Sequence, residues 1–297
     1  MKQLNTVAIV GVGLIGGSIG MALRQRGLAE RVVGIGRRQE SLRAARRVGA
    51  VNNTTVDLAK GVAEADLVVV CTPVGRVVED IRRVAENCPP GTLITDAGST
   101  KVTIVDAFNS DTDNPSSEAA LLSAGKALPR GCRFLGSHPL AGGEKMGPSH
   151  ASADLFEGRV TVVTPTKSTL AEDFDFLETF WTALGSMVVK MSAAEHDQAV
   201  AMTSHLPHAV AVVLACSVPE EFFRLIGTGF LNTTRIASGG PEIWKQIFAL
   251  NRDNVLAALS HFGRNLASLE TAIRNGDEAM IERILTLAKN NRDALGS

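Results

Sequence analysis

One segment of the chain joins a histidine to residues that hold the backbone in an unusual conformation. In SHPLAGGEKMG (137–147), His138 precedes Pro139, which favours an extended backbone at the histidine. The glycines that follow disfavour a regular helix. Imidazole titrates near neutral pH and can take or give a proton in catalysis. A lone loop histidine is more often structural, so a catalytic role for His138 depends on what surrounds it.

A second segment, SHLPHAVA (204–211), carries two more histidines. His205 and His208 are three residues apart and therefore share one face of a helix, which Pro207 is expected to kink or break. Together with His138 they could in principle bind zinc. However, the sequence has no H-E-x-x-H motif and no carboxylate at a ligand spacing, so we expect no metal.

The N-terminal residues follow the pattern of a dinucleotide-binding fold. A β-branched run (6–10) ends at a G-x-G-x-x-G motif, a helix follows, and a second strand is expected at 31–35. The glycines permit a tight turn, close approach of a pyrophosphate and close packing of helix on strand, and the helix N-terminus offers N–H groups to phosphates. The predicted cofactor contacts in this motif are Gly11, Gly13, Leu14, Ile15 and Gly16.

The end of the second strand indicates which dinucleotide binds. An NAD-binding fold usually has an acidic residue here, on the ribose 2′-hydroxyl, but this chain has Gly36 followed by Arg37 and Arg38. Guanidinium groups bind phosphate in a bidentate manner. We therefore expect NADP to be favoured, with NAD possible. If both arginines are only solvated, the protein would accept either cofactor.

Further apolar runs predict more strands, and chemically useful residues stand at their carboxyl ends. These runs cover 65–75, 89–101, 132–139, 160–165 and 186–192. Thr72 and Pro73 end the first run, at the expected edge of a cofactor cleft. Ser99 and Thr100 end the second and are expected to cap the next helix, and His138 ends the third. Because parallel sheets bind ligands at the carboxyl ends of their strands, Ser99 and His138 should share a rim with the glycine motif.

From Ser192 onward the apolar residues recur at helical spacing. We therefore predict an α/β fold class: a Rossmann-type, doubly wound and mostly parallel sheet over 1–191, followed by an all-α domain over 192–297.

Composition excludes several classes of protein. The chain has 297 residues, 45% of them hydrophobic and 21% charged, with a net charge of −1, which favours two compact domains and no nucleic-acid partner. No apolar stretch is expected to span a membrane, and no signal peptide is evident. The four cysteines are scattered, as expected of reduced thiols. These features predict a cytoplasmic protein without a membrane partner.

The chain resembles the prephenate and arogenate dehydrogenase (TyrA) family over nearly its whole length. The motifs that carry the resemblance are GVGLIGGS, TDAGSTK, GSHPLAGGEKMG, EHDQAVAMTSHLPHAVA and TRIASGGPEIWKQIF. The resemblance implies oxidative decarboxylation of prephenate to 4-hydroxyphenylpyruvate, or of arogenate to tyrosine, with hydride transfer to NAD(P). The alternatives are another NAD(P) dehydrogenase of a small hydroxy acid, and a non-catalytic NADP-binding sensor.

The resemblance also implies roles for individual residues. His138 would polarise the ring hydroxyl of the substrate, with Ser99 bonded to that hydroxyl or to the imidazole. His205, His208 and Arg235 would close on the substrate from the helical domain, with the guanidinium of Arg235 on a carboxylate.

Other family positions lie around the expected side-chain pocket. Trp244 would lie near it, reaching across a dimer or within one chain, while Glu144 and Asp197 would hold charged groups in register. Two residues depart from the family pattern: Asn232 replaces an acid and Gly143 replaces Ser, Thr or Pro, so the choice between the pyruvyl and alanyl side chains stays open. The apolar helical half and the family resemblance predict a homodimer that pairs through that half.

Overall fold

The computed structural model describes residues 2–108, 127–143 and 145–296. Six parallel strands form one sheet in the order β3-β2-β1-β4-β5-β6. They are β1 (Leu4–Val10), β2 (Ala29–Ile35), β3 (Asn53–Thr55), β4 (Leu67–Val70), β5 (Leu93–Asp96) and β6 (Arg133–Phe134). Because all pairs are parallel, the carboxyl ends of these strands meet at one edge, where ligands bind in such sheets.

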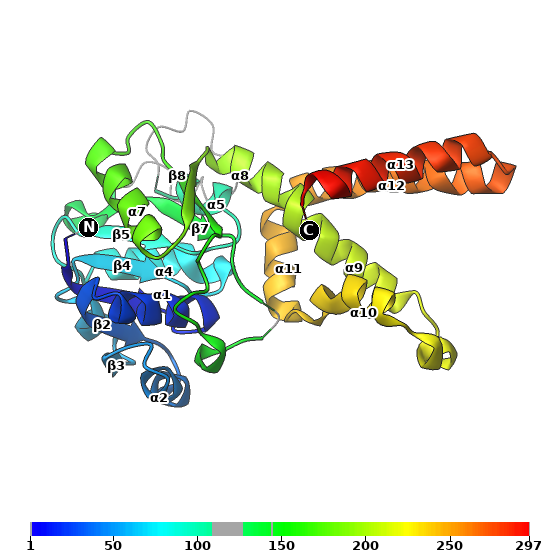
Figure 1. Cartoon of the computed structure of the whole chain (residues 1–297). Helices are drawn as coiled ribbons and strands as arrows, with labels where there is room; N and C mark the ends of the chain where they lie inside the picture. The colour runs from blue at the N-terminus through cyan, green and yellow to red at the C-terminus, as the bar shows by residue number, and fades with distance from the viewer. Residues whose placement is uncertain (1, 109–126, 144, 297) are drawn as a thin grey trace.

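Helices cover both faces of this sheet, as the unbroken apolar runs of β1 and β4 require (Figure 1). They are α1 (Leu14–Gln25), α2 (Gln39–Arg47), α3 (Leu58–Val62), α4 (Val77–Ala85) and α5 (Val102–Asp106). One core lies between the sheet and α1 and α2, and the other between the sheet, α3 and α4. The predicted Rossmann-type, mostly parallel arrangement is confirmed.

The single strand expected over 132–139 is wrong, because the chain forms two strands there. β6 pairs with β5, whereas β7 (Gly136–Pro139) belongs to a second sheet, in the order β7-β8-β9. β7 pairs antiparallel with β8 (Val160–Thr164), which pairs in parallel with β9 (Met187–Lys190), and α7 (Ala171–Ala183) covers this sheet. The antiparallel pairing takes His138 out of the main ladder and brings it opposite Val162.

The C-terminal part is helical. Its elements are α8 (Ala193–Val200), the π-helical turn η4 (Ala201–His205), α9 (Leu206–Cys216), η5 (Glu220–Leu225), α10 (Thr228–Thr234), η6 (Arg235–Ser238), α11 (Pro241–Leu250), α12 (Arg252–Asn275) and α13 (Glu278–Ala294). The break expected at Pro207 does not occur. Instead, the helix runs on through the π turn just before the proline, whose missing N–H and ring make regular α-helix unfavourable there.

This continuous helix corrects the expectation that no apolar stretch is long enough to span a membrane. Over 193–216 the helix meets that criterion by length and hydropathy, although only 28% of its most apolar window is buried in this chain. It also carries His196, Asp197, His205 and His208, all of which are buried. Length and hydropathy alone are weak evidence, since the core helix of a soluble protein passes the same test, and the buried polar groups indicate a helix packed against protein.

Two features connect the helical part to its surroundings. α11 packs against the main sheet domain, where Ile247 joins a core and the Gln246 side chain accepts a hydrogen bond from the Gly75 N–H at 3.1 Å. α12 and α13 form a hairpin that projects away from the sheet (Figure 1). α13 buries no residue, and several large apolar side chains of the hairpin, among them Leu266 and Leu287, are exposed.

Candidate active site

The glycine motif between β1 and α1 has the geometry of a phosphate-binding turn. Gly11 has a φ of +95°, and a side-chain carbon there would lie 2.7 Å from the Cys71 carbonyl oxygen, so only glycine fits. A side-chain carbon at Gly16 would lie 2.2 Å from the Gly11 carbonyl oxygen, whereas one at Gly13 would meet no atom within 4 Å. No side chain caps α1. Its first N–H groups, at Leu14 and Ile15, therefore face an open concavity that suits a pyrophosphate.

The other predicted cofactor contacts lie around this turn. Gly36 follows β2, and Arg37 and Arg38 are exposed on the loop into α2. Thr72 and Pro73 follow β4, beside Gly11. The Thr72 hydroxyl oxygen is buried and has no hydrogen-bond partner among the described residues, so it is available to a ligand.

His138 takes part in a hydrogen-bonded chain of three side chains. Its Nδ1 lies 2.8 Å from Nε2 of His196, and Nδ1 of His196 lies 2.7 Å from Oδ1 of Asp197. The two rings meet edge to face, with centroids 5.1 Å apart. His196 is fully buried and His138 half-buried. Nε2 of His138 is thus the ring nitrogen left for a substrate.

Asp197 also caps α5, which corrects the expectation that Ser99 and Thr100 do so. Its Oδ1 accepts the Lys101 N–H at 2.7 Å and its Oδ2 accepts the Val102 N–H at 2.9 Å. The Thr100 hydroxyl is buried without a partner among the described residues, and no hydrogen bond joins Ser99 to His138 there. A carboxylate satisfies two helix N–H groups at once, which a single hydroxyl cannot do.

A buried ion pair lies beneath this chain. The ammonium group of Lys101 contacts Oδ2 of Asp96, and both side chains are fully buried. The Asp96 carboxylate also accepts the Gly98 N–H at 2.8 Å and the Ser137 N–H at 3.2 Å. The pair therefore fixes the turn after β5 to the strand that carries His138.

These surroundings keep His138 neutral. Burial, and then the charges of His196, Lys101 and His205, hold the pKa of His138 well below its usual value of 6.5. A neutral imidazole with a free nitrogen can accept a proton at pH 7, which is what a general base requires.

His205 and His208 come together with Trp244. The His208 and Trp244 rings stack with centroids 3.5 Å apart and planes 7° apart, and His205 meets the edge of Trp244 at 6.0 Å. Burial is the main cause that lowers the pKa of His208. Both ring contacts of Trp244 are made with histidines of its own chain.

Asn251 determines the state of His205. Its side-chain N–H group donates to the Asp197 carbonyl at 2.7 Å and to Nδ1 of His205 at 3.2 Å. Because the Asn251 N–H group points at Nδ1 of His205, a proton on that nitrogen would be repelled by it. Burial is the main cause that lowers the pKa of His205 to about 4, with the charges of His196 and His208 acting in the same direction.

Arg235 is exposed at the start of η6, which packs against α9, the helix that carries His208. Asn232 and Gly143 are both exposed, and Glu144 lies outside the described residues. His196 was not among the predicted site residues. The adjacent pair His196 and Asp197, which resembles the histidine–carboxylate pairs of acid–base sites, was the only local signal.

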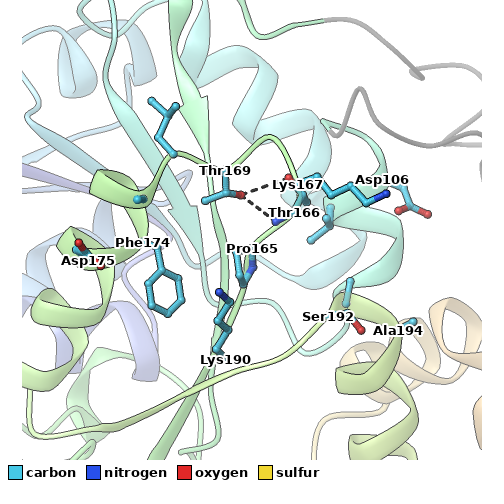
Figure 2. Close-up of a pocket in the computed structure, with 14 residues that line it drawn as sticks. Asp106, Pro165, Thr166, Lys167, Thr169, Phe174, Asp175, Lys190, Ser192 and Ala194 are labelled. Atoms are coloured by element: carbon cyan, nitrogen blue, oxygen red, sulfur yellow. Dashed lines mark hydrogen bonds between the residues drawn. The ribbon is translucent and has the colours of Figure 1, made fainter.

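The described residues hold no group of three or more His, Cys, Asp or Glu side chains suited to a metal. A cavity of about 870 Å³ lies elsewhere, between α5, α7 and the start of α8. Figure 2 shows Asp106, Lys167, Phe174, Lys190 and Ser192 around it. None of the predicted site residues lines this cavity, and several of its side chains are exposed, so it does not belong to the candidate site.

The lowered pKa of His205 predicts a pH dependence of stability. The unfolded chain takes a proton on this residue near pH 6.5, but the folded chain does so only near pH 4. The free energy of unfolding should therefore fall as the pH is lowered from 6.5 to 4. Chemical denaturation at a series of pH values should give a shallower fall for His205→Gln than for the wild type. His150→Gln, which changes an exposed histidine, is the control, and identical slopes for all three proteins would contradict the prediction.

Comparisons with known proteins identify the family of the chain. Family models match "Prephenate dehydrogenase, nucleotide-binding domain" over residues 19–190 and "Prephenate dehydrogenase, dimerization domain" over 192–287. A prephenate dehydrogenase from Bacillus subtilis is 31% identical, over 99% of this chain and 77% of that protein.

Solved structures are also similar. The prephenate dehydrogenase from A. aeolicus, in complex with hydroxyphenyl propionate and NAD+, has a TM-score of 0.84 at 30% identity, over 99% of both chains. The Synechocystis arogenate dehydrogenase has a TM-score of 0.75 at 28% identity, over 98% of this chain and 99% of that one. The chain belongs to the prephenate dehydrogenase family of NAD(P)-dependent oxidoreductases.

Proposed function

We propose that the protein oxidises and decarboxylates prephenate or arogenate, with NADP as the favoured cofactor, in the cytoplasm. Residues 1–191 would bind the cofactor, and residues 192–297 would complete the substrate site and form a homodimer. The observation that carries the proposal is the neutral His138, whose Nδ1 is engaged by His196 and whose Nε2 is left for a substrate. Relatives named for prephenate and for arogenate leave both ring acids as candidates.

The concavity at Gly13 and the uncapped start of α1 suit a dinucleotide pyrophosphate. When bound, the nicotinamide ring accepts the hydride that leaves the carbinol carbon of the substrate. Thr72 and Pro73 would border the cofactor beside Gly11, and the free hydroxyl of Thr72 offers it a hydrogen bond.

His138 would accept the proton of the substrate's ring hydroxyl at Nε2, and Ser99 would donate a hydrogen bond to the same oxygen. Arg235 would bind one substrate carboxylate in a bidentate manner. His205 and His208, both neutral and close to Trp244, would offer N–H groups and an apolar wall to the substrate side chain.

The proposed preference for NADP rests on the residues after β2. A 2′-phosphate needs cations and the absence of a carboxylate, and Gly36 with the exposed Arg37 and Arg38 meets both conditions. No ion pair involves either arginine among the described residues, so both guanidinium groups are available to a phosphate.

The proposed homodimer rests on the hairpin α12–α13. A hairpin without a partner would leave large apolar side chains such as Leu266, Ile273, Leu285 and Leu287 in water. A second copy of the chain would cover them, and a family model named for dimerization matches this region.

A substitution of His138 tests the reaction. His138→Asn keeps a similar size but cannot accept the proton, so kcat with prephenate or arogenate should fall by about 10² to 10⁴ with little change in KM. Steady-state kinetics with both substrates and both cofactors measures this. His150→Asn, which changes an exposed histidine outside the α12–α13 hairpin, should behave as the wild type. Near-normal kcat in His138→Asn would exclude His138 as the base, and no turnover of either substrate by the wild type would exclude the proposed reaction.

Cofactor preference makes a second test. The wild type should show at least about a tenfold higher kcat/KM with NADP than with NAD, roughly 1.4 kcal/mol. Gly36→Asp combined with Arg37→Ser and Arg38→Ser should reverse this order, because the carboxylate accepts ribose hydroxyls and repels the phosphate.

A side-chain carbon at Gly36 would lie 3.1 Å from Leu42 Cδ2, so the leucine must shift slightly. Gly36→Ala is therefore the matched control, and its preference should stay with NADP. Equal efficiency of the wild type with both cofactors would contradict the phosphate clamp.

The proposed dimer predicts the mass in solution. Sedimentation at micromolar concentration should give twice the chain mass of 31.3 kDa. Leu266→Glu with Leu287→Glu places charges in the proposed interface and should shift the protein toward the monomer. A monomeric wild type would contradict the dimer.

A further inference from the structure

We infer that His196 is a positioning residue that, with Asp197, holds His138 in the tautomer with a free Nε2 and shares the proton that His138 receives. The inference rests on the proposed function, because it assigns His138 as the base. It concerns a residue that the sequence motifs did not single out.

The orientation of Asp197 is fixed by backbone groups. Its two carboxylate oxygens accept the N–H groups of Lys101 and Val102, and Oδ1 also contacts Nδ1 of His196. The side chain is 1% exposed, so water does not compete for these oxygens. A carboxylate only accepts hydrogen bonds, and Nδ1 of His196 must therefore carry a proton.

That proton determines the state of both rings. With Nδ1 of His196 protonated, its Nε2 in the neutral ring can only accept a hydrogen bond. The atom 2.8 Å away, Nδ1 of His138, is then the donor, so Nε2 of His138 holds the lone pair. A cationic His196 would reverse the second hydrogen bond and leave His138 with a proton on Nε2, unable to act as a base.

The neighbouring charges favour the neutral pair before the reaction. Lys101 acts on His138 from the start of α5, where it is already paired with Asp96, and His205 acts on it from the helical part. Among the described residues that face the two rings, Asp197 is the one carboxylate that does not already pair with a lysine or arginine. Once His138 takes a proton, Asp197 is the anion that compensates it.

The proton balance of the reaction requires such storage. As the hydride leaves the carbinol carbon, the hydroxyl proton passes to Nε2 of His138. The bond from the ring to its carboxylate then breaks, CO₂ leaves, and the electron pair enters the ring, which becomes aromatic. The ring oxygen takes the proton back and becomes a phenol hydroxyl, so no net proton is released. A base that holds a proton briefly gains from sharing its charge with His196 and Asp197.

The tautomers can be measured without turnover. In protein labelled with ¹⁵N-histidine, only six histidines contribute to the spectrum, and single substitutions assign them. At pH 7 we expect His138 and His196 each to be protonated on Nδ1 and unprotonated on Nε2. A proton on Nε2 of His138, or a doubly protonated His196, would overturn the inference. If the tautomers are as expected but neither substrate turns over, the proposed function fails while the hydrogen-bond chain stands.

Kinetics of paired variants test the role in catalysis. His196→Phe keeps a ring but offers no acceptor, so kcat should fall at least about tenfold with KM within about twofold, and Nε2 of His138 should become partly protonated. His196→Gln can still accept from His138 and should retain more kcat than His196→Phe. If the phenylalanine variant does not fold, His196→Gln against the wild type carries the kinetic test. Equal kcat in the wild type and both variants would overturn the inference.

The pH profile separates the relay from a merely structural role. Asp197→Asn removes the compensating charge, so the acid limb of kcat/KM should move to lower pH while its maximum falls. Asp173→Asn is the matched control, since Asp173 is another buried carboxylate, bonded to Arg133 at 2.7 and 2.9 Å. That variant should lose stability with no change in the profile. The same profile in Asp197→Asn as in the wild type would overturn the role of the charge.

Discussion

Both oxygens of the Asp197 carboxylate are buried between the two halves of the chain, where they accept two backbone N–H groups of α5 and the N–H of His196. Burying such a charge costs several kcal/mol, and each charge-assisted hydrogen bond returns about 1.5–3 kcal/mol. Three such hydrogen bonds offset this cost. If one of them were lost, water could not replace it, because the carboxylate is buried. The contact therefore sets where the helical part joins the sheet, and with it the position of His196 beside His138.

The buried pair of Asp96 and Lys101 supports the same arrangement from below. Its carboxylate accepts the N–H groups of Gly98 and Ser137, which ties the turn after β5 to β7. Its ammonium group helps to lower the pKa of His138. One ion pair thus fixes the strand that carries the imidazole and adds to the effect of burial, which is the main cause of the low pKa of His138. A hydrophobic pair of similar volume could pack there, but it could neither accept the backbone N–H groups of Gly98 and Ser137 nor lower the pKa of His138.

Local patterns in the sequence predicted the parts of the fold that depend on local interactions. The glycine motif, the apolar strands and the helical spacing after Ser192 all describe contacts within one element or between neighbours. The cap of α5 could not be found in this way. Ser99 and Thr100 have suitable side chains just before the helix, but the carboxylate that caps it instead is Asp197, 96 residues beyond Lys101, whose N–H it accepts. His196 could not be found from local patterns either, because its role depends on His138, 58 residues earlier.

The π turn at 201–205 explains how one apolar helix serves this site at two points. In regular α-helix, the nine residues from His196 to His205 would make about two and a half turns and place the two side chains on opposite sides. A π turn uses more residues per turn, so it reduces that rotation and brings His205 round toward His196. Asn251 links the two ends of this stretch of helix, since its side chain donates hydrogen bonds to both the Asp197 carbonyl and His205. Pro207 makes regular α-helix unfavourable at this point. The proline that was expected to kink or break the helix therefore accounts for the π turn that precedes it.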